Sequence, residues 1–262
     1  MPAKTQALDN RARMVRILTY NVHRCVGVDR KLDVGRVAAV IAAQEPDIVA
    51  LQELDVGRAR TGGVDQAHEI ARRLGMTSHF NAALRVEEEQ YGDAILTDLP
   101  ERLVKAGPLP THPRLKLLEP RGAVWVALRV GGAELHVIAT HLGLVPREQR
   151  LQAAALAGAD WVGAAPPGAP MIVLGDMNAA PRTVVYRTFA AHLTEARRSV
   201  RATRLTPTFP STFPVLPIDH VFVSRAIEVK RVRTPLDQLS RLASDHLPLV
   251  VDFRLRAPPA SA

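Results

Sequence analysis

The chain has little of three things: cysteine, aromatic side chains and long apolar runs. Only one of its 262 residues is a cysteine, which excludes an internal disulfide framework and a zinc site built from several thiolates. Aromatic residues make up only 4% of the sequence, so side chains on which nucleic-acid bases could stack are scarce. No apolar run approaches the roughly 18 residues that a membrane-spanning helix needs. The polar segment 1–14 has no apolar signal-peptide core, so we expect a cytoplasmic protein.

The remaining composition is that of an ordinary globular protein with a basic balance. Hydrophobic residues make up 47% and charged residues 23% of the chain, which is long enough to bury a sizeable core. The formal net charge of +8 favours polyanionic partners such as nucleic acid, an anionic membrane surface or phosphorylated metabolites. A solvated basic surface explains the same charge equally well, so both interpretations stay open. Several arginines stand in segments expected to be loops or tails: Arg11, Arg13, Arg197, Arg198, Arg201 and Arg204.

Apolar runs that are typical of strands alternate along the chain with segments of helical spacing. Strands are predicted over residues 15–20, 48–51, 79–84, 94–97, 102–106, 123–130, 135–140, 171–174, 218–224, 227–233 and 247–254. Helices are predicted over residues 34–43, 66–74, 147–163 and 183–192, the first with Asp33 as its N-cap. Two mixed sheets packed face to face with helices outside satisfy this order. We expect a flexible N-terminus over residues 1–14, one domain over 15–255 and a disordered tail over 256–262.

Short polar clusters stand at the ends of four predicted strands, at residues 21–23, 52–53, 176–178 and 245–246. A carboxylate or imidazole at the mouth of an apolar strand is costly to desolvate unless something uses it. Open α/β sheets place ligands and metals at such strand ends. The clusters therefore indicate one composite site. Its carboxylates, amides and imidazoles suit a hard divalent cation and a phosphate ester.

Six segments together identify the sequence with a known superfamily. They are Asn21-Val22-His23, Gln52-Glu53, Thr140-His141-Leu142, Gly175-Asp176-Met177-Asn178, Ile218-Asp219-His220 and Ser244-Asp245-His246. In this order and at strand ends, they resemble the endonuclease/exonuclease/phosphatase superfamily. That group includes deoxyribonuclease I, exonuclease III, neutral sphingomyelinases and inositol polyphosphate 5-phosphatases. The resemblance covers about residues 15–255, fits the small bacterial branch, and implies a four-layer α/β/β/α sandwich of two mixed sheets.

Cleavage of a phosphate ester needs an aligned water, neutralised phosphoryl charge and help for the leaving group. Mg²⁺, or Mn²⁺ in its place, supplies the neutralisation and needs only one or two protein carboxylates. Glu53 is the first candidate for a metal ligand. The resemblance adds Asp245, which would hold the metal directly or through water, and Asn21, which would orient Glu53 or a metal-bound water.

The candidate catalytic residues come from the later segments. Asp176 and Asn178 are two positions apart, so on an extended backbone both side chains face the same way. The resemblance implies that Asp176 is the base and that Asn178 donates to a phosphoryl oxygen; a simple Asx-turn is the structural alternative. His141 and His246 would face the phosphate. In the superfamily the last histidine pairs with an upstream carboxylate, here Asp219, and serves either as a donor or as the general base.

Four further residues are candidates for substrate binding. His23 stands where many members of the superfamily have an acid or an amide, and His220 follows Asp219 directly. Arg58 and Arg121 belong to basic loops that could grip a second phosphate or a nucleic-acid backbone. Asp93 is an added carboxylate that could bind a second cation or pair with His141.

These observations predict a Mg²⁺-dependent phosphohydrolase, in particular a phosphodiesterase that uses in-line attack by water. A lipid headgroup or a small phosphoester is the favoured substrate. One alternative is a metal-dependent endonuclease or exonuclease that acts on DNA through backbone contacts. A second is a non-catalytic protein that binds anionic ligands. We expect a monomer without a transmembrane segment, with contact to an anionic membrane surface left open.

Overall fold

The computed structural model describes residues 13–86, 89–113, 118–200 and 206–256. The predicted flexible N-terminus and disordered tail fall almost entirely on segments 1–12 and 257–262, outside the described residues. Arg11, Arg201 and Arg204 lie outside them as well. In the described ranges, no helix combines the length and the apolar character needed to cross a membrane.

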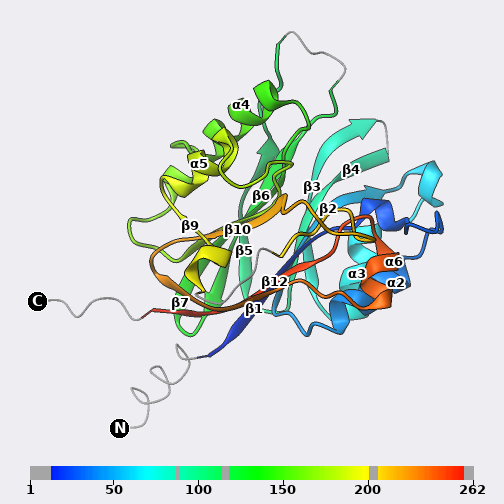
Figure 1. Cartoon of the computed structure of the whole chain (residues 1–262), viewed down its shortest axis with the longest axis horizontal. Coiled ribbons are helices and arrows are strands. Elements are labelled where there is room, and N and C mark those ends of the chain that lie inside the picture. The colour runs from blue at the N-terminus through cyan, green and yellow to red at the C-terminus, as the bar shows by residue number, and fades with distance from the viewer. Residues whose placement is uncertain (1–12, 87–88, 114–117, 201–205, 257–262) are drawn as a thin grey trace, which may run out of the picture.

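Twelve strands of the described chain form two mixed sheets of six strands each (Figure 1). The first sheet, in the order β11-β12-β1-β2-β4-β3, contains β1 (Val15–Asn21), β2 (Ile48–Val56), β3 (Thr77–Val86), β4 (Glu89–Thr97), β11 (Ile227–Arg233) and β12 (Leu249–Leu255). The second, in the order β5-β6-β7-β8-β10-β9, contains β5 (Glu101–Pro108), β6 (Gly122–Val130), β7 (Ala133–His141), β8 (Met171–Asp176), β9 (Thr194–Glu195) and β10 (Asp219–Val223).

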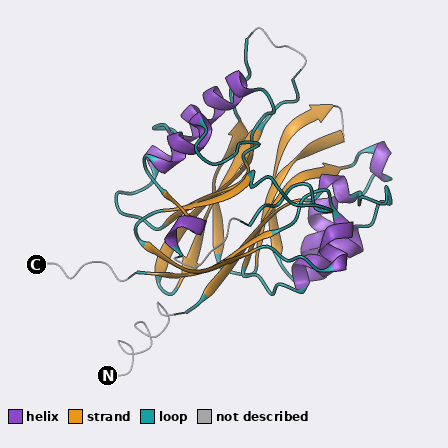
Figure 2. Cartoon of the chain, viewed as in Figure 1, coloured by secondary structure: helices purple, strands orange, loops and turns teal. Residues whose placement is uncertain are grey.

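Helices cover the two outer faces of this pair of sheets (Figure 2). The first sheet is covered by α2 (Val34–Ala42), α3 (Gln66–Leu74) and α6 (Gln238–Ala243), and the second by α4 (Pro146–Ala157) and α5 (Val184–Ala190). Short 3-10 turns complete the order: η2 (His23–Cys25), η3 (Ala59–Thr61), η4 (Val162–Ala164) and η5 (Ala196–Ser199). The predicted four-layer α/β/β/α sandwich is confirmed.

The alternation of side chains along the strands explains the layers. On β1, Val15 and Ile17 belong to the apolar cluster between the two sheets, whereas Leu18 and Tyr20 belong to the cluster under α2 and α3. Neighbouring residues of a strand point to opposite faces, so a strand that is apolar on both faces must be covered on both. A third cluster lies under α4 and α5. The inner faces of the two sheets thus pack against each other, and the outer face of each sheet packs against one layer of helices.

Element boundaries differ from the prediction in a few places. Helix α4 ends at Ala157 rather than at residue 163, because Gly158 has an extended backbone and a separate 3-10 turn follows. Strand β2 continues beyond its apolar start to Val56, and the short helix α6 was not predicted. The predicted N-cap of α2 is confirmed, since the Asp33 carboxylate accepts from the backbone N–H of Arg36.

Strand pairing brings the polar clusters to one edge of the sandwich. β1 and β2 are parallel, with Asn21 opposite Gln52. β7 and β8 are parallel in the other sheet, with His141 opposite Asp176. β10 is antiparallel to β8, so its first residue, Asp219, lies opposite Asp176. The ends of four strands (β1, β7, β8 and β10) and the middle of β2 therefore meet where α/β folds place ligands.

Gly175 allows the close approach of β7 and β8 immediately before Asp176. Its φ of +140° lies outside the range that other residues adopt readily. A Cβ atom at this position would lie 1.8 Å from the carbonyl oxygen of Thr140. The glycine that precedes the carboxylate is thus required by the packing of the two strands.

Candidate active site

A cavity of about 520 Å³ opens at this edge of the two sheets. Asn21 and Asp219 lie directly behind its wall, in contact with residues that form it. Arg58 and His220 are not part of the wall. Eight of the residues predicted from the sequence line the cavity: His23, Glu53, Arg121, His141, Asp176, Asn178, Asp245 and His246.

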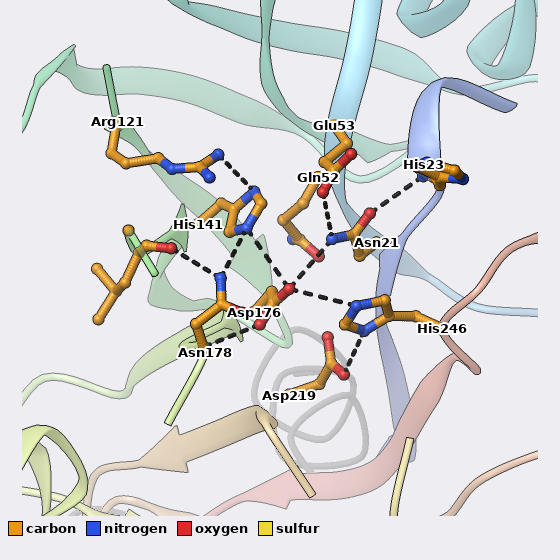
Figure 3. A network of polar contacts seen from close by, with 12 residues as sticks. Asn21, His23, Gln52, Glu53, Arg121, His141, Asp176, Asn178, Asp219 and His246 are labelled. Carbon is orange, nitrogen blue, oxygen red and sulfur yellow. Dashed lines mark hydrogen bonds and ion pairs between the residues drawn. The ribbon is translucent and has the colours of Figure 1, made fainter. Parts of the chain in front are cut away.

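The carboxylate of Asp176 is the centre of the polar network (Figure 3). Its Oδ2 accepts from Asn21 Nδ2 at 3.1 Å and lies 3.5 Å from His141 Nε2 and 3.6 Å from His246 Nε2. Its Oδ1 accepts from the backbone N–H of Asn178 at 2.9 Å. Burial, followed by the charge of Asp219, raises the pKa of Asp176 to about 7. A carboxyl group with such a pKa is suited to accept a proton near neutrality.

Asp219 and His246 form a buried ion pair. His246 Nδ1 lies 2.9 Å from Asp219 Oδ2, so the contact implied by the superfamily resemblance is present. Burial alone would lower the pKa of His246, but the charge and hydrogen bond of Asp219 outweigh it and raise that pKa to about 10. The ring is therefore an imidazolium at neutral pH. Its Nε2–H remains free to face the cavity.

Asn21 joins Glu53 to Asp176. Its Nδ2 donates to Glu53 Oε1 at 3.0 Å as well as to Asp176, while its Oδ1 accepts from the backbone N–H of His23 at 3.0 Å. Because a backbone N–H needs an acceptor and the carboxylates need a donor, this orientation of the amide is fixed. Asn21 therefore orients the two carboxylates through Nδ2, while its Oδ1 keeps one lone pair beyond the bond to His23.

His141 is held as a neutral ring by a buried arginine. Arg121 NH1 lies 3.0 Å from His141 Nδ1 and Asn178 Nδ2 lies 3.1 Å from His141 Nε2, so a donor group faces each ring nitrogen. Burial, with the positive charge of Arg121, lowers the pKa of His141 well below its ordinary value. The two histidines of the site thus differ in charge: His141 is neutral and His246 is a cation.

Three residues around the cavity have a left-handed backbone. Glu53, Asn178 and His23 have φ values of +61°, +46° and +45°, and each such conformation costs about 1–3 kcal/mol for a residue other than glycine. Glu53 adopts it where the pairing of β2 with β4 shifts register between Leu51 and Leu54. Strain of this kind clusters at functional sites. The sequence pattern carried no sign of it.

The conformation of Asn178 is supported from behind the cavity. Gln149 Nε2 donates to the carbonyl oxygens of Asn178 at 2.9 Å and of Gly143 at 2.8 Å. His220 Nε2 donates to the carbonyl oxygen of Ala179 at 2.8 Å. His220 is buried and does not line this cavity, so its predicted role in substrate binding stays a prediction.

The other predicted residues have different surroundings. His23 lines the cavity, but its ring contacts Val26 and Arg24 rather than the central network. Asp245 lines the same cavity and accepts weakly from Ser244 Oγ at 3.3 Å. The side chain of Arg58 pairs with Glu89 at 3.3 Å. Arg60, not Arg58, lines the cavity.

Two further residues, Cys25 and Asp93, are buried. Cys25 is buried, and burial raises the pKa of its thiol, so it is not a thiolate nucleophile. Asp93 is buried close to Arg121, with a pKa raised by burial to about 8. No contact between Asp93 and His141 is present in the described chain, where Arg121 occupies the expected place.

Several residues of the site were not recognised from the sequence. Thr208 Oγ1 donates to Asp219 Oδ2, and the ring of Phe209 packs on His246 with centroids 4.8 Å apart. Tyr91 and Glu119 line the cavity beside Arg121. Neither Thr208 nor Phe209 has a local sequence signal for its contact.

The donor set fits a hard divalent cation at Glu53. Its carboxylate reaches the cavity with one hydrogen bond on Oε1, and Asp245 supplies a second carboxylate to the same cavity. Potential ligand atoms of Asp176, Asp219 and His246 also lie within 4.8 Å of one another. That cluster is therefore a second candidate for holding a metal ion.

The comparisons with known proteins agree with this geometry. The model of the endonuclease/exonuclease/phosphatase family matches residues 18–246. The chain belongs to this family. It is 27% identical over 280 residues to the uncharacterized protein YbhP of Escherichia coli K12, covering 97% of this chain and 100% of that protein.

Solved structures share the fold. An endonuclease/exonuclease/phosphatase from Beutenbergia cavernae is similar with a TM-score of 0.78 and 25% identity, over 95% of this chain and 74% of that one. The human Nocturnin catalytic domain with a bound sulfate anion is similar with a TM-score of 0.69 and 23% identity, over 92% of this chain and 94% of that one. A mannosyl-6-phosphatase from Bacteroides thetaiotaomicron is similar with a TM-score of 0.70 and 19% identity, over 91% of this chain and 99% of that one.

Proposed function

We propose that the protein is a phosphoester hydrolase that depends on a divalent metal, and more specifically a phosphodiesterase. The observation that carries this proposal is the arrangement of Asp176 between the two histidines. A carboxyl group with a pKa of about 7 faces the same cavity as an imidazolium and a neutral imidazole. A proton acceptor and a proton donor are thus held a few ångströms apart, as general acid–base catalysis requires.

Glu53 would hold the metal, with Asp245 as a second oxygen donor from the other end of the chain. A bound Mg²⁺ or Mn²⁺ ion would polarise the phosphoryl group and neutralise its charge. Asn21 keeps the Glu53 carboxylate in place through Nδ2. Metal binding is thus coupled to the position of Asp176, because the same Nδ2 donates to both.

Asp176 would accept the proton of the attacking water. Its Oδ1 is fixed by the backbone N–H of Asn178, which leaves Oδ2 turned towards the histidines. The Asn178 amide would hold the water or a phosphoryl oxygen. Its Nδ2 donates to the carbonyl oxygen of Leu142 at 2.9 Å and lies 3.1 Å from His141 Nε2, and these two contacts fix the direction of the amide.

His246 and His141 would stabilise the negative charge that develops on the phosphoryl oxygens. The Nε2–H of His246 is a cationic donor, and charge-assisted hydrogen bonds of this type are roughly twice as strong as neutral ones. The His141 ring is neutral, so it would add a polar contact without a second positive charge. Both rings are buried, where such polar groups act strongly because water is excluded.

The shape of the cavity favours a compact substrate. About 520 Å³ lies within the usual range for small-molecule sites. Among the described residues of its wall, only Tyr91 and Phe209 have aromatic rings apart from the histidines, so a row of stacked bases has little support. A lipid headgroup or a small phosphoester is the favoured substrate, and a nuclease activity is the competing outcome.

A substrate panel tests the proposal. Purified protein is assayed with Mg²⁺, Mn²⁺ or EDTA against bis-p-nitrophenyl phosphate, phosphomonoesters, phospholipids and supercoiled plasmid. We expect metal-dependent turnover of diesters that Asp176→Asn and His246→Ala both remove. Plasmid nicking that Glu53→Gln abolishes would favour the nuclease instead. Metal-independent turnover, or full activity of the Asp176 variant, would contradict the proposal.

A further inference from the structure

A cluster of positive and aromatic side chains lies beside the proposed catalytic centre and is not used by the mechanism above. Arg121 precedes β6 and is only 7% exposed, yet it lines the cavity. Tyr91 on β4 is 5% exposed and lines the same cavity. Arg60 in η3 places its guanidinium 5.6 Å from the centroid of the Tyr91 ring. The three side chains form one wall of the cavity.

The two arginines differ in how their charge is balanced. Arg60 makes two hydrogen bonds, of 2.8 and 2.7 Å, to the buried carboxylate of Asp55, which fixes its guanidinium while the side chain stays 40% exposed. Arg121 is paired with Glu119 at 2.8 Å, and that glutamate side chain is 45% exposed. The Nε atom of Arg121 is buried without a hydrogen-bond partner in the described part of the chain.

The ion pair with Glu119 compensates the buried charge of Arg121 only weakly. An ion pair with a well-exposed carboxylate contributes little to stability, whereas burying a guanidinium is costly unless its donors are satisfied. Arg121 therefore has unused capacity to bind an anion, and the exposed Glu119 carboxylate occupies the place that such an anion would take.

We propose that Arg60, Tyr91 and Arg121 form a subsite for a second anionic group of the substrate, a phosphate or a carboxylate, and that Glu119 occupies this subsite in the free enzyme. The inference rests on the proposed hydrolase function and names its substrate class. Arg121 NH1 is 3.0 Å from His141 Nδ1, and His141 Nε2 is 3.5 Å from Asp176. Only the imidazole ring separates the subsite from the reacting centre. The second anionic group must therefore lie within a few bonds of the scissile phosphate.

The subsite is tested by equilibrium binding of non-hydrolysable probes at a fixed free Mg²⁺ concentration. Methylphosphonate has one anionic group, methylenediphosphonate has two phosphonates, and phosphonoacetate has a phosphonate and a carboxylate. We expect the wild type to bind at least one of the two-anion probes about tenfold more tightly than methylphosphonate. Whichever of the two-anion probes binds more tightly shows whether the second group of the substrate is a phosphate or a carboxylate. Equal affinity for all three probes would overturn the proposal.

Variants separate the subsite from general electrostatics. Glu119→Gln removes the competing carboxylate at an exposed position, and it should tighten two-anion probes about threefold to fivefold without changing methylphosphonate. Arg60→Met should abolish the preference for two anions. Arg58→Met is the matched control, because Arg58 lies in the same loop but pairs with Glu89 away from the cavity. Equal effects of the Arg58 and Arg60 variants, or no effect of Glu119→Gln, would overturn the proposal.

The outcomes also distinguish the subsite from the hydrolase. A two-anion preference in a protein that turns over no phosphoester would contradict the proposed function alone. Normal turnover of a simple diester without any two-anion preference would contradict the subsite alone. Arg60→Met leaves the Asp55 carboxylate without its guanidinium, so its melting temperature is measured first. If that variant unfolds, Glu119→Gln decides the question by itself.

Discussion

Asp176 and Asp219 are direct partners across the antiparallel pair of β8 and β10. Both carboxyl groups are almost completely buried, and two negative charges at this separation repel each other strongly in a medium of low dielectric constant. His246 compensates by lying between them, with Nδ1 2.9 Å from Asp219 and Nε2 3.6 Å from Asp176. The three groups therefore hold their protons as one coupled unit.

The first prediction is that Asp176→Asn removes activity but stabilises the metal-free fold. Burial and the Asp219 charge raise the pKa of Asp176 from 3.8 to about 7, so its ionisation opposes folding. That cost is absent below pH 3.8, grows between pH 3.8 and 7, and is complete above pH 7. We expect kcat to fall about 10³-fold and stability at pH 8 to rise by an amount of the order of 2 kcal/mol.

Thermal unfolding at pH 4 and pH 8 measures this effect. Asp98→Asn, at an exposed position, is the control and should change neither property. A variant that is less stable than the wild type at pH 8 would show that the ionised Asp176 is stabilised by its neighbours, contrary to the raised pKa.

The second prediction concerns the alkaline limit of activity. The pKa of His246 is about 10 in the folded protein against an ordinary value of 6.5, chiefly because Asp219 outweighs the effect of burial. This pair stabilises the fold fully below pH 6.5, and the contribution is lost as the pH rises through 10. We expect kcat/KM to rise through about pH 7 with Asp176 and to fall near pH 10 with His246. Asp219→Asn should move the alkaline limb to lower pH.

Histidine NMR signals followed against pH measure the same quantity without turnover. In Asp219→Asn, the His246 resonance should titrate at a lower pH than in the wild type. An unchanged titration, or an alkaline limb that does not move, would mean that another group controls this limit.

The architecture could be predicted because it depends on local patterns. Runs that are apolar on both strand faces require cover on both sides, which led directly to two sheets between helical layers. The site followed from the same patterns, since polar residues follow the apolar runs of β1 and β2 and the parallel pairing of these strands brings them side by side. The parallel register of β1 and β2 places Asn21 opposite Gln52. Membership of the family was predicted from six short segments and is confirmed by the family match.

Side-chain pairing between distant residues could not be predicted in this way. Arg197 was assigned to a solvated loop, yet it is buried and bonds to Glu195, to Thr206 and to the carbonyl oxygen of Asp219. Arg58 and Arg60 are two positions apart in one loop, and only the contact of Arg60 with Asp55 decides which one faces the cavity. Such contacts depend on tertiary structure and leave no periodic trace in the chain.

The third prediction is that Glu53→Gln weakens metal binding without unfolding the protein. The variant keeps the size of the side chain and an acceptor for Asn21 Nδ2, but it removes the negative charge that a hard cation needs. We expect Mn²⁺ affinity to fall at least about tenfold and activity to need correspondingly more metal. Calorimetric titration with Mn²⁺ measures the first effect directly. Glu45→Gln is the control, because that side chain is 88% exposed; equal Mn²⁺ affinity in both variants would exclude Glu53 as a ligand.

The fourth prediction assigns His220 a positioning role. Its Nε2–H holds the carbonyl oxygen of Ala179, next to Asn178 with its left-handed backbone, while its ring packs against Tyr186 and Phe222. His220→Phe keeps the aromatic packing but leaves a buried carbonyl group without a donor, which costs about 1–3 kcal/mol. We expect kcat to fall about tenfold with little change in KM, because a small displacement of Asn178 affects the transition state more than binding.

A rescue variant separates positioning from simple loss of stability. His220→Gln restores an amide donor to the carbonyl oxygen of Ala179 and should recover much of kcat, even where its melting temperature remains lower than that of the wild type. Because His220 does not line the cavity, neither substitution should alter the pH limits set by Asp176 and His246. Full kcat in His220→Phe would show that Gln149 alone holds the loop, through its bond to the carbonyl oxygen of Asn178.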